Sequence, residues 1–237
     1  MIDELHAAAT KLISQVPHGA DGFTCKDLFP DVYRISVSAR HELFVAEIAV
    51  DGGSLYYLIL YDPATGAVTH DPPSVDARWT ENFGAKDPLL KKPFVSSADL
   101  FQNHHPQIVI EERLHNGPGV NGVAYHYFDI GPNLALTRVL TLEARMMAYD
   151  PPERMFEREL TQLSPTRLRL DTFAVPCDDS AHGKFLGCDD SAHRKELGYA
   201  ILESDGANAP FHVMEQHPKD GHLKSGLVTG MGDSSRW

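Results

Sequence analysis

The chain has 237 residues, of which 42% are hydrophobic, and this is enough to build a buried core. Its 21 Lys and Arg against 33 Asp and Glu give a formal net charge of -12, which repels nucleic acid phosphates and anionic membrane surfaces. We therefore expect no nucleic acid and no membrane among its partners. No apolar run approaches the roughly 20 residues that a transmembrane helix needs.

The cysteines and the N-terminus indicate the compartment. Three cysteines are an odd number, and Cys25 is far in sequence from Cys177 and Cys188, which fits a reducing compartment better than a disulfide framework. Residues 1–6 are acidic and lack the basic start and apolar core of a signal peptide. We expect a cytoplasmic protein, and the sequence does not indicate its oligomeric state.

The first third of the chain predicts a helix followed by a small meander. Apolar residues recur at spacings of three and four over residues 2–15, and Pro17 ends this pattern. Four strands follow, separated by turn residues such as Asp51-Gly52-Gly53. Their expected ranges are 33–40, 43–50, 54–61 and 67–70.

Periodicity is lost between residues 71 and 106, where Pro72, Pro73, Pro88 and Pro93 predict a long irregular excursion. Loops of this length tend to be functional, disordered or linkers. We expect a loop that covers one end of a sheet, and a mobile lid over a site is the alternative.

The centre of the chain predicts a second and larger meander. Alternating apolar and polar residues mark strands at 107–115, 123–130, 134–149, 154–163 and 167–175. The third is too long for one regular strand, and Arg138 on its apolar side indicates a bulge there. The leucines on the apolar parity, Leu140, Leu142, Leu168 and Leu170, are expected in the core.

The fold class predicted is α+β: a predominantly antiparallel β meander, arranged as a large twisted sheet, a sandwich or a partly closed barrel, with an N-terminal helix. We treat residues 1–237 as a single domain. Further strands are expected at 198–203 and 211–216.

An 11-residue tandem repeat occupies residues 177–198, where Cys-Asp-Asp-Ser-Ala-His occurs twice. The simplest interpretation is a surface loop lengthened by duplication. The repeat also brings two thiols and two imidazoles into one segment, which is a ligand set that zinc accepts, although the short Cys-x2-Cys hook of zinc fingers is missing. The candidate metal ligands are Cys177, His182, Cys188 and His193.

Two further groups of residues contain histidines that are candidates for metal or ligand binding. His212, Glu215 and His217 resemble a metal-ligand set, but His212 and Glu215 have opposite parity in a regular strand and would point to opposite faces. His126 has the same parity as Phe128, and Arg138 comes from the next strand. If the sheet encloses a cavity, His126, Phe128 and Arg138 are the predicted ligand-binding residues.

No assembled acid, base and nucleophile set is visible in the sequence, so the function expected is that of a binding protein. A curved sheet face or the 71–106 loop would engage a small ligand or a protein. The alternatives are a metal-dependent enzyme of hydrolase type, built on the histidine-rich loops, and an acidic immunity or adaptor module.

Overall fold

The computed structural model describes residues 31–36, 41–50, 53–69, 73–77, 94–116, 120–148, 154–176, 194–206 and 208–219. Within these ranges the chain forms antiparallel strands and one 3-10 turn, Pro132–Leu134, and contains no α-helix. The helix predicted over residues 2–15 lies outside the described residues. No helix in the described ranges has the length and apolar character needed to cross a membrane.

The N-terminal strands form a five-stranded sheet in the order β1-β2-β3-β4, with β5 paired to β3. Their bounds are β1 Asp31–Ser36, β2 Glu42–Val50, β3 Gly53–Asp62, β4 Ala67–Val68 and β5 Ser74–Ala77. Val50 pairs with Gly53, so only two residues connect β2 to β3, as expected for the tight hairpin predicted at this point. The predicted N-terminal meander is confirmed.

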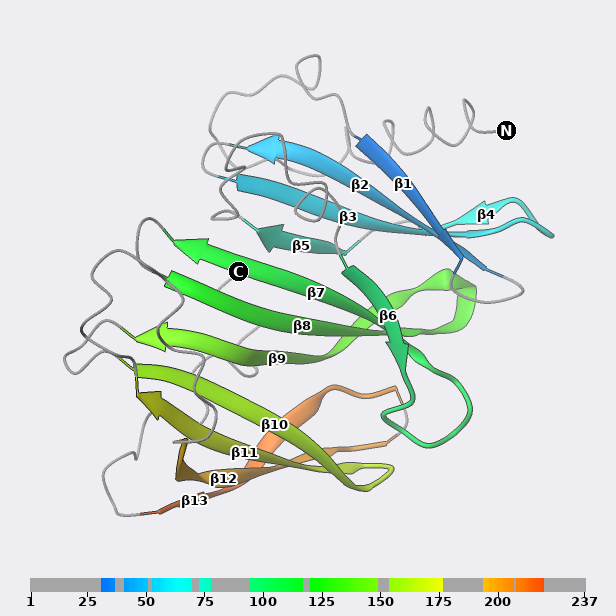
Figure 1. Cartoon of the computed structure of the whole chain (residues 1–237). Helices are drawn as coiled ribbons and strands as arrows, with labels where there is room; N and C mark the ends of the chain where they lie inside the picture. The colour runs from blue at the N-terminus through cyan, green and yellow to red at the C-terminus, as the bar shows by residue number, and fades with distance from the viewer. Residues whose placement is uncertain are drawn as a thin grey trace.

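The remaining strands form an eight-stranded antiparallel sheet in the order β13-β12-β11-β10-β9-β8-β7-β6 (Figure 1). Their bounds are β6 Phe94–Ala98, β7 Gln107–Asn116, β8 Val120–Ile130, β9 Leu136–Ala148, β10 Arg154–Ser164, β11 Arg167–Pro176, β12 Lys195–Ser204 and β13 Phe211–Pro218. Each strand pairs with the next one in sequence, so the second meander is confirmed, together with the two strands predicted after it.

The eight-stranded sheet is strongly curved. This follows from contacts between segments that lie next to its two opposite edges. Phe101 follows β6 at one edge, and its ring stacks at 5.4 Å between centroids on Phe211, which begins β13 at the other edge. The Gln162 side-chain amide of β10 also donates a hydrogen bond to the Leu100 carbonyl oxygen at 2.5 Å. The sheet therefore encloses apolar side chains on its concave face.

Two hydrophobic clusters lie on opposite faces of the large sheet. The inter-sheet cluster joins the small sheet to β7 and β8, and its buried members are Leu43, Leu58, Leu60, Val75, Ile108, Ile110, Phe128 and Leu134. The concave cluster is enclosed by β8–β13, and its buried members are Leu100, Phe101, Val139, Leu140, Leu142, Leu168, Leu170, Ala200, Leu202 and Phe211. The four leucines predicted to be in the core are all in the concave cluster.

A β-bulge in β9 decides which of its side chains face each cluster. Phe128 pairs with Arg138 and Tyr127 pairs with Leu140, so Val139 is an extra residue on β9. The predicted bulge beside Arg138 is thus confirmed. The simple alternation expected along the strand at 134–149 does not hold, because the extra residue reverses it: Leu136 packs on the inter-sheet cluster and Leu140 lies in the concave cluster.

The predicted excursion over residues 71–106 contains two strands, β5 and β6, and is therefore less irregular than expected. Residues 78–93 lie outside the described residues. The last part, residues 99–106, is an ordered loop in which the Asp99 carboxylate accepts hydrogen bonds from the backbone N–H groups of Asn103 and His104. Leu100 and Phe101 of this loop are buried in the concave cluster, as expected of a covering loop.

The repeat at 177–198 also departs from the prediction of a loop throughout. Residues Lys195 to Gly198, the last four of the second copy, belong to β12 and pair with β11. Residues 177–193 lie outside the described residues, and the four candidate zinc ligands are among them.

Candidate ligand-binding face

The site is built on the face of β7, β8 and β9 that also carries the inter-sheet cluster. Cross-strand pairing places Ile110 beside His126, and His126 beside Thr141. The next row toward the β8 N-terminus has Ala124 at its centre, paired with Glu112 on one side and Glu143 on the other. Apolar packing around Phe128 therefore gives way to polar side chains within two residues along β8.

We call Glu112, His126, Arg138, Thr141 and Glu143 the polar face. Neighbouring strands are about 4.8 Å apart, and residues that follow at every second position lie on one face, so these five side chains share a compact area.

A chain of hydrogen bonds crosses the three strands. The Nε2 atom of His126 lies 2.5 Å from Oε2 of Glu112, and both side chains are more than nine-tenths buried. The other ring nitrogen, Nδ1, lies 3.2 Å from the hydroxyl oxygen of Thr141. Because an ionised carboxylate can only accept, Nε2 carries the proton toward Glu112. In the neutral ring, Nδ1 then accepts a hydrogen bond from the Thr141 hydroxyl group.

One oxygen atom in this series of hydrogen bonds has no hydrogen-bond partner among the described residues. Glu112 Oε1 is buried, and no hydrogen bond to it is found among the residues that the structure describes. The great majority of buried polar atoms in proteins are hydrogen-bonded, because an unsatisfied buried acceptor costs about 1–3 kcal/mol. A buried carboxylate oxygen of this kind is an unusual feature and calls for a physical explanation.

Arg138 lies beside the apolar end of the polar face. Its guanidinium carbon is 5.3 Å from the centre of the Phe128 ring, within the range of a cation–π contact. Burial lowers the pKa of Arg138, and the negative charge of Glu112 acts in the opposite direction. The two charges therefore interact across the face.

Glu143 and Arg158 form an ion pair at the β9 side. Arg158 Nη1 donates to the Glu143 backbone oxygen at 3.0 Å and lies 3.4 Å from its Oε2. Burial raises the pKa of Glu143, whereas the charge of Arg158 and its hydrogen bond lower it. The charge of Glu112 raises the pKa of Glu143 further, so the two carboxyl groups on either side of Ala124 act on each other electrostatically.

The polar face is closed at β7 and β8 and reaches solvent at β9. Glu112 and His126 are only 7% and 6% exposed. Arg138, Thr141 and Glu143, all on β9, are partly exposed. A buried, hydrogen-bonded carboxyl–imidazole pair with polar side chains leading from it toward solvent makes this face the candidate binding site.

The sequence-predicted ligand-binding residues are thus brought together: His126 and Phe128 are buried on one face of β8, and Arg138 contacts Phe128 from β9. Sequence reasoning missed Glu112, Thr141 and Glu143 as members of this site. A signal for Glu112 did exist, since it follows Ile108 and Ile110 on the inward parity of β7. After two inward-facing isoleucines, a charged residue at the next inward-facing position is not expected in a strand that only packs into a core.

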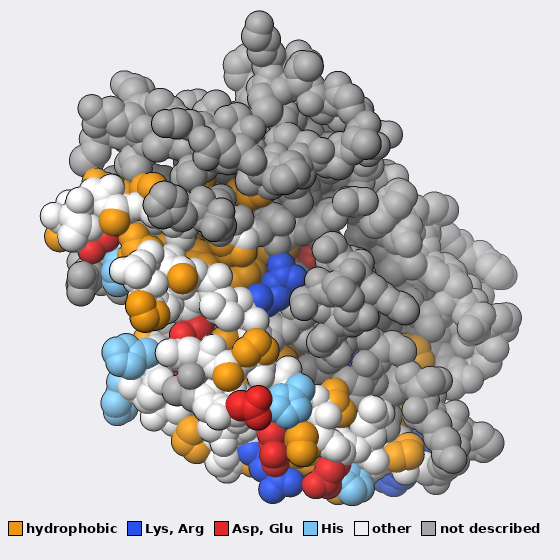
Figure 2. Space-filling view, turned by 180° about the vertical axis from the view of Figure 1, so that it is seen from behind, with side chains coloured by type: hydrophobic (Ala, Val, Ile, Leu, Met, Phe, Trp, Pro, Cys, Tyr) orange, Lys and Arg blue, Asp and Glu red, His pale blue; other side chains and the backbone are white. Residues whose placement is uncertain are grey.

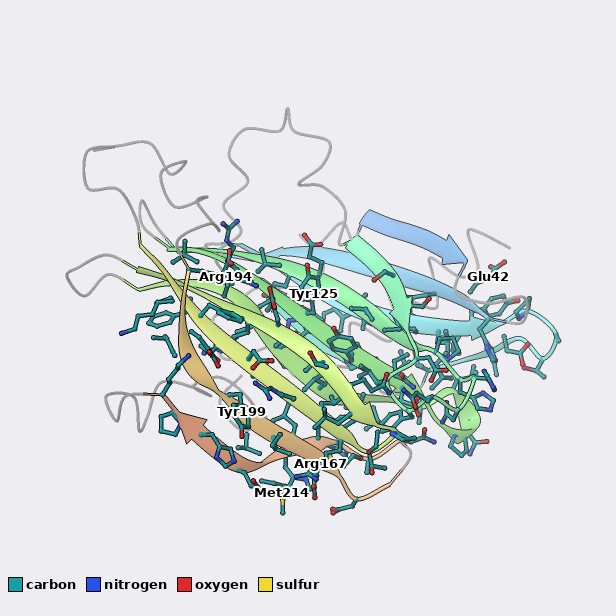
Figure 3. All side chains as sticks on the ribbon, turned by 60° about the horizontal axis from the view of Figure 1, so that its bottom comes forward. Glu42, Tyr125, Arg167, Arg194, Tyr199 and Met214 are labelled. Atoms are coloured by element: carbon teal, nitrogen blue, oxygen red, sulfur yellow. The ribbon has the colours of Figure 1, made fainter. Side chains whose placement is uncertain are left out.

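The outer face of the C-terminal strands carries a separate set of polar contacts. The Arg169 guanidinium carbon lies 4.0 Å from the centre of the Tyr199 ring, which stacks on His217 at 4.6 Å. Tyr199, Arg167 and Met214 lie together on β11–β13, away from Tyr125 (Figure 3). Acidic, basic and histidine side chains alternate along the lower edge of the molecule in Figure 2, so this surface has no single sign of charge.

The parity argument against His212, Glu215 and His217 is wrong. Leu202 pairs with Val213 and Ile201 with Glu215, so Met214 is an extra residue in β13 and the alternation reverses there. His212 and Glu215 consequently share a face, and Glu215 Oε2 lies 3.0 Å from His217 Nε2. Among the described residues, no group of three or more His, Cys, Asp or Glu side chains is arranged to hold a metal ion.

Comparisons of the chain with protein families, with curated proteins and with solved structures gave no match. The polar face is therefore the basis of the proposed function.

Proposed function

We propose that this protein binds a small ligand on the polar face of β7–β9, with its entrance on the β9 side. The observation that supports this most directly is the buried Glu112–His126 pair, in which Glu112 Oε1 has no hydrogen-bond partner among the described residues. Burying two ionisable groups costs several kcal/mol per charge unless they are fully compensated, and a hydrophobic pair at the same place is often more stable. A site that serves binding accounts for such a cost.

The composition of the face suits a small molecule. Phe128 is a fully buried aromatic ring at the apolar end of this face, and His126 and Arg138 place polar groups beside it. Ligand sites in proteins combine a mostly apolar lining with a few convergent polar groups. The proposal uses the three ligand-binding residues predicted from the sequence, but it places them on the face toward the small sheet and not in a cavity on the concave face.

A thermal-shift screen of small polar molecules tests the proposal, using wild-type protein, Arg138→Met and the control Arg169→Met. A ligand at 100 times its dissociation constant stabilises a protein by about 2.7 kcal/mol. For a chain of this size, this is a rise in melting temperature of roughly 5–10 °C. We expect at least one compound to stabilise wild type and Arg169→Met but not Arg138→Met. Equal stabilisation of all three, or none in the whole screen, contradicts the proposal.

A metal-dependent hydrolase is the second candidate, and it depends on Cys177, His182, Cys188 and His193, which lie outside the described residues. No contact in the described part of the chain favours it over ligand binding. The chelator experiment described in the Discussion separates the two.

A further inference from the structure

The unpartnered oxygen of Glu112 indicates the chemistry of the ligand. Its second oxygen, Oε2, is occupied by His126 at 2.5 Å, which holds the carboxylate over β8. Glu112 itself pairs with Ala124, so the carboxylate lies beside the smallest side chain of that row. An ionised carboxylate oxygen accepts hydrogen bonds only, so whatever satisfies Oε1 must be a donor.

Ala124 is the small residue at the centre of this row. It is 2% exposed, and its methyl side chain stands between two long acidic residues, Glu112 and Glu143. With neighbouring strands about 4.8 Å apart, the Cα atoms of these two acids are about 10 Å apart. A group placed over the methyl group of Ala124 would therefore lie between two carboxyl groups.

The electrostatics over Ala124 favour a cation. Burial is the main cause of the raised pKa of Glu143, and the charge of Glu112 raises it further while His126 acts in the opposite direction, so the two carboxylates repel one another across this row. Arg158 offsets part of the charge of Glu143 from the neighbouring strand β10, and Arg138 lies two rows away beside Phe128. A positively charged donor over Ala124 would relieve the repulsion and satisfy Glu112 Oε1 in one step.

We infer that the ligand presents a cationic nitrogen, best a primary ammonium group, to Glu112 over Ala124. This inference rests on the proposed function, because it names the chemical class of the ligand bound at the same face. A primary ammonium has three donors on one atom, so it can bond Glu112 and Glu143 together. Hydrogen bonds between charged groups are about twice as strong as those between neutral ones.

The test uses three probes of the same length, butylammonium, 1-butanol and butyrate, titrated at matched ionic strength and followed by NMR and by melting temperature. The variants are Glu112→Gln, which keeps the shape but removes the charge, and Ala124→Leu, which places a larger side chain between Glu112 and Glu143. Glu215→Gln on the outer face is the matched control. We expect butylammonium alone to bind wild type and Glu215→Gln. Its affinity should fall at least about tenfold in Glu112→Gln and be lost in Ala124→Leu.

The failure of this inference is distinguishable from the failure of the proposed function. Binding of 1-butanol or butyrate that depends on Arg138, without binding of butylammonium, overturns the cationic ligand and leaves the binding site in place. Butylammonium binding that is unchanged in Glu112→Gln overturns the inference as well. If none of the probes binds and the broader screen finds no ligand, both proposals are wrong. Circular dichroism and wild-type-like melting of Glu112→Gln establish that the variant is folded.

Discussion

At the scale of single residues, Glu112 and His126 are the pair on which the proposed site depends. Replacing only His126 by Phe leaves the Glu112 carboxylate buried without its partner, which should cost about 3–5 kcal/mol of unfolding free energy. The double variant Glu112→Leu/His126→Phe removes both ionisable groups at similar volume and should recover most of this loss. Urea unfolding of the wild type, both single variants and the double variant measures the coupling.

If the loss of stability in the double variant equals the sum of the two single losses, the coupling energy is zero and Glu112 and His126 do not form the interacting buried pair that the proposed site requires. Restored stability together with lost ligand binding is the outcome that the proposed function requires.

Tyr127 gives a second prediction at this scale, on the opposite face of β8. Burial, reinforced by the neighbouring Tyr125, raises the pKa of Tyr127 from its ordinary value of 10.0 to about 12. Between these two values the folded protein binds more protons than the unfolded chain, so stability is fully present below pH 10 and is lost as the pH rises toward 12. The loss is about 2 kcal/mol.

Unfolding curves at pH 9 and pH 11.5 should therefore show a smaller alkaline loss in Tyr127→Phe than in wild type. Tyr199→Phe, on the outer face, serves as the control and should keep the wild-type loss. If Tyr127→Phe loses as much stability between pH 9 and pH 11.5 as the wild type does, the Tyr127 hydroxyl group remains hydrated in the folded protein.

At the scale of elements, the alternation of side chains along β10 and β11 decides which leucines are buried in the core. Leu170 is fully buried in the concave cluster, whereas Leu163 near the hairpin is 50% exposed. Leu170→Ala should cost about 2–5 kcal/mol, since it leaves a cavity among packed side chains. Leu163→Ala should change stability by no more than about 0.5 kcal/mol. Chemical denaturation of the two variants checks this, and similar losses in both would contradict the assigned faces.

Bulges are the feature of these elements that alternation in the sequence does not locate. One extra residue, Val139, separates Arg138 from Leu140 and places them on opposite faces of β9. Another, Met214, brings His212 and Glu215 to the same face of β13. The first was foreseen because a charge interrupted an apolar pattern. The second bulge is not marked by such an interruption in the sequence, so only the pairing of β13 with β12 reveals it.

At the scale of the whole molecule, the repeat can be tested by deleting residues 188–198. The first copy would then supply Lys184, Phe185, Leu186 and Gly187 in place of Lys195 to Gly198 at the start of β12. Gly198 has φ of +136°, and an added Cβ there would lie 2.3 Å from the His217 backbone oxygen. The deletion keeps a glycine at this position, so we expect the fold to be retained.

Thermal melts with and without a chelator measure the outcome. A shorter loop changes the closure free energy by less than about 1 kcal/mol, so the curves of intact and shortened protein should nearly coincide. If the two Cys and two His residues of the repeat share zinc, the deletion forfeits much of a binding free energy that can reach about 10 kcal/mol or more. A chelator-induced drop in the intact protein alone would support the metal-dependent alternative.

The sequence by itself determined the strands and most of their inward residues. Alternation predicted β7 to β11 as consecutive neighbours and placed Leu168 and Leu170 in the core, because side chains on a strand point to opposite faces with a period of two. It also placed His126 and Phe128 on one face. These are local properties of a single strand, and each can be read from a few adjacent residues.

Only the tertiary structure decided what lies across from each strand. The division into two sheets, the curvature that brings Phe101 onto Phe211 and the register that sets Glu112 beside Ala124 are pairings between residues far apart in the chain. The unpartnered oxygen of Glu112 follows from these pairings and from no sequence pattern. The physical reason is that strand register and sheet packing are chosen by the burial of many side chains at once, whereas alternation reports only one strand at a time.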